Sequence, residues 1–177
     1  FFAANNMRYT AVATATPAET VSAYADGRCT VATSDVSQLY ALRQQLPQPG
    51  EQLILPDVIS KEPLGPAVVQ SDAAWATLVK WVHFALLDAE ELGVASDTLD
   101  DAVASKKSAV RILIGLDGNL GSKLGVKDTW VQDVIRTVGN YGEIFERNLG
   151  TATGLGIPRG LNQLWDRGGI QYAPPVE

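Results

Sequence analysis

Hydrophobic and polar residues follow two different spacings within the first 45 positions. Residues 8–15 and 29–33 are rich in β-branched and apolar side chains, a composition that predicts two short strands, the second covered on both faces. Apolar residues at helical spacing follow each run, at Val21, Tyr24 and Ala25 and then at Leu39, Leu42 and Leu46. Thr16-Pro17-Ala18-Glu19 carries a capping box with proline at the first helical position. This strand–helix–strand–helix order is typical of a parallel sheet, so the sequence predicts an α/β fold.

The second predicted strand ends at Ser34 and Asp35, and the next helix is expected to begin at once. In open α/β sheets, ligands bind at the carboxyl ends of the strands. Two interpretations stay open at this point. Either Ser34 or Asp35 only caps the helix, or the Asp35 carboxylate is held ready for a ligand group.

Prolines interrupt the pattern between residues 47 and 66. A proline within an extended run favours an edge or a connection over a central strand. We interpret this stretch, which includes Lys61-Glu62-Pro63-Leu64-Gly65, as a crossing between two lobes. Residues 66–70 are then expected to form the first strand beyond the crossing.

The remaining chain is predicted to be mostly helical. Ser71 is expected to cap a long helix that ends at Gly93, with Lys80, Asp88, Glu90 and Glu91 on a solvated face. Further helices are expected at 97–105, at 107–115 and, after a loop at 118–125, from a cap at Asp128 through Leu149. Gly139 and Gly142 lie inside that last helix at a cost of about 1 kcal/mol each relative to alanine, which indicates close packing or a local kink. One more short helix is expected at 161–165, followed by an extended tail.

Composition and charge exclude several functions. The 177-residue chain has a net charge of −6 and no run of Lys or Arg, which argues against nucleic-acid binding. No apolar stretch approaches the roughly 18 residues that a membrane span needs. The first six residues lack the basic and apolar regions of a signal peptide and are more typical of the end of a helix.

Residues for catalysis or metal binding are few. His83 is the only histidine, and its place among apolar helix residues favours packing. The only cysteine, Cys29, lies inside a predicted strand and cannot form a disulfide within this chain, so we expect it to pack as a small apolar side chain. No zinc ligand set is present. Residues 154–160 are rich in glycine, but their spacing does not match a dinucleotide loop and Pro158 interrupts them. We therefore expect no metal and no cofactor.

Several blocks of the chain, in a fixed order, carry a family resemblance. They are Gly27-Arg28-Cys29, residues 34–43, Lys61 to Pro66, Ala89-Glu90-Glu91-Leu92-Gly93, residues 139–148, Pro158-Arg159-Gly160-Leu161-Asn162 and residues 169–175. Together they resemble the general L-amino-acid-binding periplasmic proteins of bacterial ABC importers. The resemblance runs through the whole chain, but it corresponds only to the carboxyl-terminal portion of such proteins.

The resemblance implies a partial periplasmic-binding-protein fold of type II, with two α/β lobes that close on an L-amino acid. Residues 1–57 would be part of the second, distal lobe, and residues 58–177 the carboxyl-terminal part of the first lobe. Asp35, with Ser34 beside it, matches the position that binds the ligand's α-ammonium group, and Glu62 and Pro63 match the hinge. The implied location is the periplasm, and the implied partner is the membrane permease of the importer.

The departures from the family pattern matter as well. None of the arginines at 28, 43, 111, 136, 147, 159 and 167 matches the family's arginine for the ligand carboxylate. The resemblance also implies a disulfide from Cys29 to a cysteine that this chain does not contain. We expect the missing amino-terminal half, or a second copy of the chain, to cover its open surfaces. Two other functions stay possible: an enzyme on the same fold, and a fragment that binds no solute and serves as an interaction or swapped-assembly module.

Overall fold

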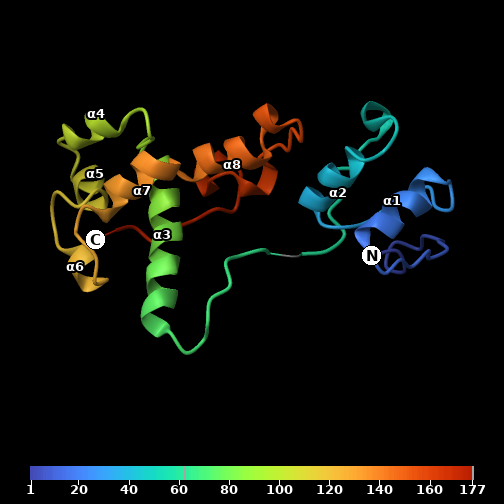
Figure 1. The fold of residues 1–177 in the computed structure, drawn as a ribbon, viewed down its shortest axis with the longest axis horizontal. Coiled ribbons are helices and arrows are strands. Elements are labelled where there is room, and N and C mark those ends of the chain that lie inside the picture. Colours follow the sequence, from blue (N-terminus) through green and yellow to red (C-terminus); the bar gives the residue numbers. More distant parts are fainter. Residues whose placement is uncertain (62, 177) are drawn as a thin grey trace. The chain divides into compact units, whose positions relative to one another are not determined.

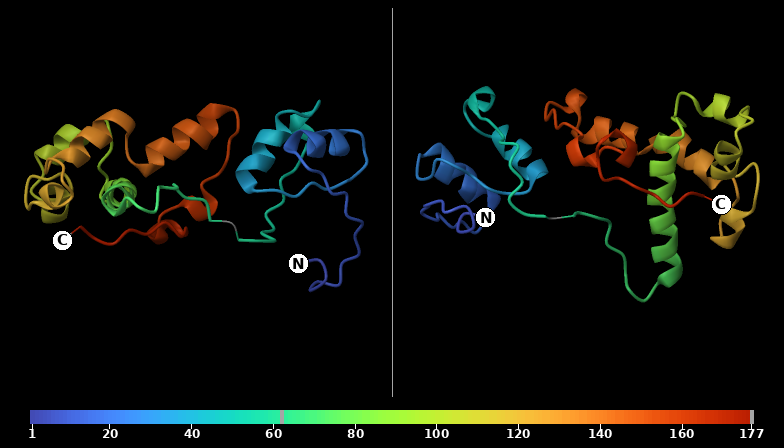
Figure 2. Two further views of the ribbon diagram at one scale, coloured as in Figure 1. Left: turned by 60° about the horizontal axis from the view of Figure 1, so that its bottom comes forward. Right: turned by 180° about the vertical axis from the view of Figure 1, so that it is seen from behind.

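The computed structural model describes residues 1–61 and 63–176, which divide into two compact units, Phe1–Gly65 and Pro66–Glu177 (Figures 1 and 2). The first unit contains helices α1 (Pro17–Ala25) and α2 (Val36–Arg43) and the 3₁₀ turn η1 (Pro49–Glu51). The second contains helices α3 (Ala73–Glu91), α4 (Leu99–Val103), α5 (Ser108–Leu113), α6 (Leu120–Lys123), α7 (Trp130–Val138) and α8 (Tyr141–Leu149). It ends with the 3₁₀ turns η2 (Thr151–Thr153), η3 (Gly160–Asn162) and η4 (Trp165–Arg167). Of the two predicted hinge residues, Pro63 lies in the extended chain before the unit boundary. Glu62 lies outside the described residues.

Both helices of the first unit begin where the sequence predicts. The hydroxyl of Thr16 accepts a hydrogen bond from the backbone N–H of Glu19, with Pro17 at the first helical position of α1. Helix α2 starts directly after Asp35. Within residues 1–61, the buried hydrophobic side chains are Ala23 and Leu42, one from each helix. The first unit therefore has only a small core.

The three predicted strands, at 8–15, 29–33 and 66–70, do not form in the described chain. The only β-pairing among the described residues is an isolated parallel bridge between Leu164 and Gln171. A strand exists only when its backbone pairs with a neighbour, and β-branched composition cannot supply that neighbour. The expected burial of residues 29–33 is also wrong here, since Val31 is 62% exposed. The described residues thus form helices and extended segments without the predicted sheet.

The predicted long helix from residue 128 to 149 is wrong, because the chain forms two helices there. Gly139 has a φ of 77°, which ends α7, and the side chain of Asn140 then caps α8 in a capping box with Glu143. Asp128 does not cap α7; its carboxylate accepts a hydrogen bond from the backbone N–H of Ser122 at 2.8 Å. The two explanations left open for the glycines were a local kink and close packing. At Gly139 the first is the better one, since the helix is interrupted there.

Other boundaries in the second unit differ in smaller ways. Asp72, not Ser71, caps α3, since its carboxylate accepts the backbone N–H of Trp75 at 2.9 Å. Helices α4 and α5 confirm the expected helices at 97–105 and 107–115 with shorter bounds. The predicted loop at 118–125 contains α6, and the predicted helix at 161–165 is replaced by η3 and η4. Short turns of this kind depend on contacts with the rest of the chain more than on their own periodicity.

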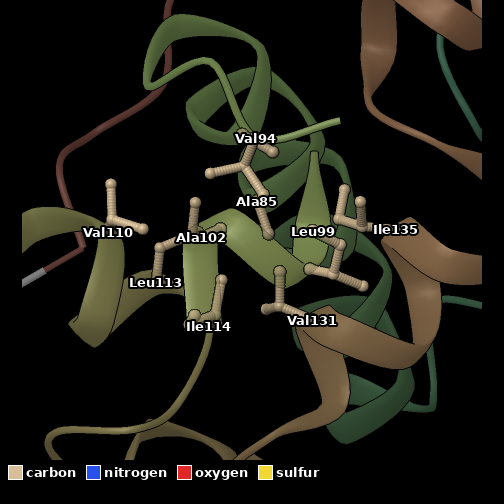
Figure 3. Close-up of a cluster of buried hydrophobic side chains, with 10 residues drawn as sticks. Ala85, Val94, Leu99, Ala102, Val110, Leu113, Ile114, Val131 and Ile135 are labelled. Carbon is tan, nitrogen blue, oxygen red and sulfur yellow. The ribbon is translucent and has the colours of Figure 1, made fainter. Parts of the chain in front are cut away.

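The second unit has a core of its own. Ala85 and Ala89 on α3 pack with apolar side chains from α4, α5 and α7, among them Leu99, Ile114 and Ile135 (Figure 3). A smaller cluster joins Leu87 to Leu164 and Ala173 of the carboxyl-terminal segment. Both clusters involve the carboxyl-terminal half of α3. Among the described residues, no helix is both long and apolar enough to cross a lipid bilayer.

Candidate ligand-binding site

Asp35 occupies the N-cap position of α2, but its side chain does not cap the helix. The backbone there has φ −55° and ψ 144°, and the Asp35 carbonyl accepts the N–H of Leu39 at 2.9 Å. The carboxylate makes no hydrogen bond to the first turn of α2 and is partly exposed. Capping the helix would be the simplest explanation for an aspartate at this position, but the Asp35 carboxylate oxygens do not do so.

Ser34 does not cap α2 either. Its exposed hydroxyl donates a hydrogen bond to the side-chain oxygen of Gln38, one turn further along α2. This contact fixes the serine side chain against the outer surface of the helix. The interpretation in which Ser34 or Asp35 only caps the helix thus has no side-chain hydrogen bond in its favour.

A shallow polar hollow of about 160 Å³ lies next to Ser34. Its wall is made mainly of side chains with hydroxyl or amide groups, namely Thr14, Thr16, Thr20, Thr33, Ser34 and Gln38. The hydroxyls of Thr14 and Thr20 are 2.7 Å apart and share a hydrogen bond. Asp35 does not line the hollow. The volume is below the roughly 300–1,000 Å³ of complete ligand pockets, so this hollow by itself provides at most part of a site.

Cys29 is a free, partly exposed thiol in the extended segment before Ser34. The expectation that it packs as a buried apolar side chain is therefore wrong in this chain. As at Val31, the described residues form no sheet that would bury this segment.

His83 lies in the middle of α3 and packs against aromatic rings. Its imidazole centroid is 6.3 Å from that of Phe84 and 6.0 Å from that of Tyr141, in an edge-on arrangement with the latter. Burial lowers the pKa of His83 below its usual value, which favours the neutral ring. The geometry supports the packing role that the sequence predicts. No group of three or more potential metal ligands occurs among the described residues.

A buried charged cluster in the second unit contradicts the predicted solvated face of α3. Glu90 is only 7% exposed, and its carboxylate pairs with Arg159 at 3.0 Å and with Arg167 at 3.6 Å. The Arg159 guanidinium also lies 5.2 Å from the ring centroids of both Tyr141 and Phe145. The prediction failed because α8 and the segment after it pack over this side of α3, which helical periodicity cannot indicate.

Gly142 is where α8 approaches this cluster. A Cβ atom at Gly142 would lie 3.0 Å from the Glu90 carboxyl carbon and 3.1 Å from an Arg159 nitrogen. The second explanation offered for the two glycines, close packing, is therefore correct at Gly142. The cluster holds α3, α8 and the carboxyl-terminal segment together, with the Glu90 carboxylate paired to two arginines.

Asp88 is also buried on α3, again against the prediction of a solvated face. Among the described residues, its Oδ2 atom has no hydrogen-bond partner. Burial, assisted by the nearby negative charge of Glu91, raises the pKa of Asp88 to about 6. Such a group weakens the fold when it ionises.

Comparison with known proteins identifies the class. No protein-family profile matches the chain. The chain is nevertheless related over 99% of its length to amino-acid-binding proteins of ABC transporters, which confirms the resemblance that the sequence blocks indicate. It spans about half the length of the curated relatives that it matches.

Three of these relatives come from different bacteria. The chain is 48% identical to the putative amino-acid ABC transporter-binding protein YhdW of Escherichia coli K12 and to the general L-amino acid-binding periplasmic protein AapJ of Rhizobium johnstonii, covering 52% of each. It is 44% identical to the glutamate/glutamine/aspartate/asparagine-binding protein BztA of Rhodobacter capsulatus, again over 52% of that protein.

A solved structure shares the fold. It is an ABC transporter periplasmic binding protein from Brucella ovis with glutathione bound. The match has a TM-score of 0.89 and 44% identity, and it covers 99% of this chain and 56% of the other. The chain therefore has the fold of the corresponding part of a periplasmic binding protein.

Proposed function

We propose that this chain is the carboxyl-terminal portion of a periplasmic solute-binding protein that captures L-amino acids for uptake through an ABC importer. The relatives' names support the ligand class and the transport role. In this proposal residues 1–57 belong to the distal lobe and residues 58–177 to the first lobe, and Glu62 and Pro63 are part of the hinge. The sheet that the sequence predicts forms when the remaining half of the protein supplies strands to pair with segments 8–15, 29–33 and 66–70.

Within that site, Asp35 binds the α-ammonium group of the ligand, with Ser34 beside it. The observation that carries the proposal is that Asp35 sits at the N-cap of α2 with a carboxylate that makes no cap bond. A carboxylate is the natural partner of an ammonium ion, since the charged pair forms strong hydrogen bonds. The ligand carboxylate and most of the ligand side chain contact residues outside this chain, because no arginine here matches the family position.

The Brucella ovis structure suggests a second ligand. Glutathione contains a γ-linked glutamate residue whose α-ammonium and α-carboxylate are free, the same head group as an amino acid. In this proposal Asp35 pairs with the ammonium group of either compound. Amino acids remain the first proposal, since two of the relatives named above are named for amino-acid ligands and a third for amino-acid transport.

The test uses a complete binding protein, made by joining this chain to the part of AapJ that it does not span. Thermal shift against the twenty L-amino acids and glutathione identifies the ligand, because a bound ligand raises the unfolding temperature. Calorimetry then compares Asp35→Ala with the unaltered protein. We expect a loss of about 3–5 kcal/mol, or roughly two to three and a half decades in affinity, because a buried ammonium group loses its partner.

Asp26→Ala is the matched control. Asp26 is another carboxylate of the same unit, and it lies at the carboxyl-terminal end of α1 rather than at the start of α2. It should leave the affinity unchanged. If Asp35→Ala also leaves the affinity unchanged and lowers the stability by only about 1 kcal/mol, Asp35 is a helix residue and the binding role is wrong.

The proposal includes the importer's membrane permease as a partner and the periplasm as the location, both taken from the kind of protein the relatives are. No enzymatic role is proposed, since the relatives are named as binding proteins and Asp35 would be the only acid or base offered to the ligand. A non-binding interaction module is the outcome if no tested compound stabilises the complete protein.

A further inference from the structure

Gln38 occupies the third position of α2, counted from the N-cap residue Asp35. A glutamine or glutamate at this position commonly accepts a backbone N–H at the start of its helix, as part of a capping box. In α8 the Glu143 carboxylate accepts the N–H of the N-cap residue at 2.7 Å, and in α1 the Glu19 carboxylate accepts the N–H of the residue before the N-cap at 2.8 Å. In α2, by contrast, the side-chain oxygen of Gln38 accepts the hydroxyl of Ser34. Gln38 is thus used for a side chain of the proposed ligand site.

This contact decides what Ser34 has left to offer a ligand. A serine hydroxyl carries one proton and two lone pairs. Because the proton is donated to Gln38, the Ser34 oxygen has only lone pairs left, and these accept hydrogen bonds. The Asp35 carboxylate is also an acceptor, and it makes no cap bond in α2. Two neighbouring residues therefore present acceptors alone, which suits an ammonium group, since that group has three donors and no acceptor.

Removing the Gln38 acceptor would free the Ser34 proton. The hydroxyl would then turn toward another acceptor, and the nearest one in the sequence is the Asp35 carboxylate. A hydrogen bond to a carboxylate is stronger than one between neutral groups, so it would compete with the ligand's ammonium group for the same oxygens. Gln38 prevents this competition by accepting the proton itself.

We propose that Gln38 is a positioning residue of the ligand site, which holds the Ser34 hydroxyl so that Ser34 and Asp35 present only acceptors to the ligand's ammonium group. The inference rests on the proposed function, since it takes Ser34 and Asp35 as ligand-binding residues. It adds a rule of specificity. Compounds with a free ammonium group bind, whereas the corresponding 2-oxo acids, which have an acceptor in place of that group, are rejected.

The experiment uses the fusion of this chain with the part of AapJ that it does not span, and calorimetry with L-glutamate as the probe. Gln38→Met keeps the helix propensity but removes the acceptor, and it should weaken L-glutamate binding about fivefold, the size of one neutral hydrogen bond. Gln38→Glu keeps an acceptor and should bind L-glutamate within about twofold or more tightly. When Ser34→Ala is also present, Gln38→Met should change the affinity by less than about twofold, because no hydroxyl is left to hold.

Selectivity provides a readout that a merely structural role would not move. The freed Ser34 hydroxyl of the Gln38→Met variant can donate to the oxo group of 2-oxoglutarate. The ratio of the affinities for L-glutamate and 2-oxoglutarate should therefore fall by at least about fivefold in this variant. An unchanged ratio would overturn the inference.

Gln45→Met is the matched control, because Gln45 is an exposed glutamine just beyond the end of α2. It should change both affinities by no more than about twofold. A loss in Gln38→Glu as large as in Gln38→Met, or an equal loss with and without the Ser34 hydroxyl, would show that position 38 acts through packing. If Asp35→Ala weakens binding and Gln38→Met does not, the proposed function stands and the role of Gln38 alone is wrong. If neither substitution has an effect, both are wrong.

Nuclear magnetic resonance tests the contact itself without any ligand. In this chain, Ser34→Ala should shift the side-chain amide signals of Gln38, because their oxygen loses its donor. The side-chain signals of Gln45 should stay in place. Unchanged Gln38 signals would refute the inference whatever the affinities are.

Discussion

The two units of this chain differ in how large a core each forms from its own residues. The second unit buries alanine, valine, leucine and isoleucine side chains from four helices, α3, α4, α5 and α7, in one cluster and adds the ion pair between Glu90 and Arg159. Within the described residues of the first unit, only Ala23 and Leu42 are buried hydrophobic residues. This is the unit that contains Asp35, which we propose binds the ligand's ammonium group. The comparison teaches that the unit with the proposed ammonium-binding residue, Asp35, is the one with the smaller core of its own.

The largest effect should come from the core of the second unit. Ile135→Ala, at a side chain with 0% exposure, should lower the free energy of unfolding by about 2–5 kcal/mol because it leaves a cavity among packed helices. Leu42→Ala in the first unit should cost only about 1 kcal/mol, since few buried neighbours surround Leu42. Urea unfolding of both variants makes the comparison. Equal losses would show that the first unit has a core of comparable strength.

The ion-pair cluster provides the next effect. Arg159→Ala should lower the free energy of unfolding by about 3 kcal/mol, because Glu90 stays buried with only the longer contact to Arg167. Arg147→Ala is the control, since the exposed Arg147 makes one hydrogen bond to the Val138 carbonyl and should cost less than about 1 kcal/mol. If Arg159→Ala is as mild as its control, the cluster contributes nothing to holding the carboxyl-terminal segment.

Asp88 should make the second unit less stable as the pH rises. Its pKa is raised from 3.8 to about 6 in the folded chain, so the folded state binds the proton more tightly than the unfolded state. The free energy of unfolding should therefore fall between about pH 4 and 6 and level off above that range. Asp88→Asn should stabilise the chain by at most about 3 kcal/mol at pH 7.5 and by almost nothing at pH 4.

Asp101→Asn controls for the loss of one carboxylate, since Asp101 lies on α4 and is exposed. Thermal unfolding at several pH values measures both variants. Hydrogen bonds from Ser96 and Asn140 outweigh burial and hold the pKa of Glu143 low, but that carboxyl is present in both variants and cancels in the comparison. An Asp88→Asn gain that is the same at pH 4 and 7.5 would contradict the assignment.

The smallest effect concerns the accessibility of the Cys29 thiol in the first unit. In this chain the partly exposed thiol should react with a thiol reagent within about tenfold of the rate in the unfolded chain. In a complete binding protein that supplies the second cysteine implied by the family resemblance, no free thiol should be found at this position before reduction. A slow reaction in the isolated chain would mean that the first unit is more closed than its exposed side chains indicate.

The sequence by itself determined the local features whose signals lie within a few residues. The Thr16 cap of α1, the start of α2 after Asp35 and the positions of α3, α4 and α5 follow from capping residues and helical periodicity. The family resemblance, carried by several short blocks in order, was also readable from the sequence and is confirmed by the relatives. The roles of Ser34, Asp35, Glu62 and Pro63 stay predictions.

Only the tertiary structure decided the features that need a distant partner. Residues 29–33 have the composition of a buried strand, but a strand requires another strand beside it, and residues 1–61 and 63–176 do not provide one. Glu90 and Asp88 have the sequence pattern of a solvated face, but both are buried, and Glu90 is covered by α8 and the carboxyl-terminal segment. Periodicity shows which face of a helix is apolar, but what covers either face depends on chain that is far away in the sequence.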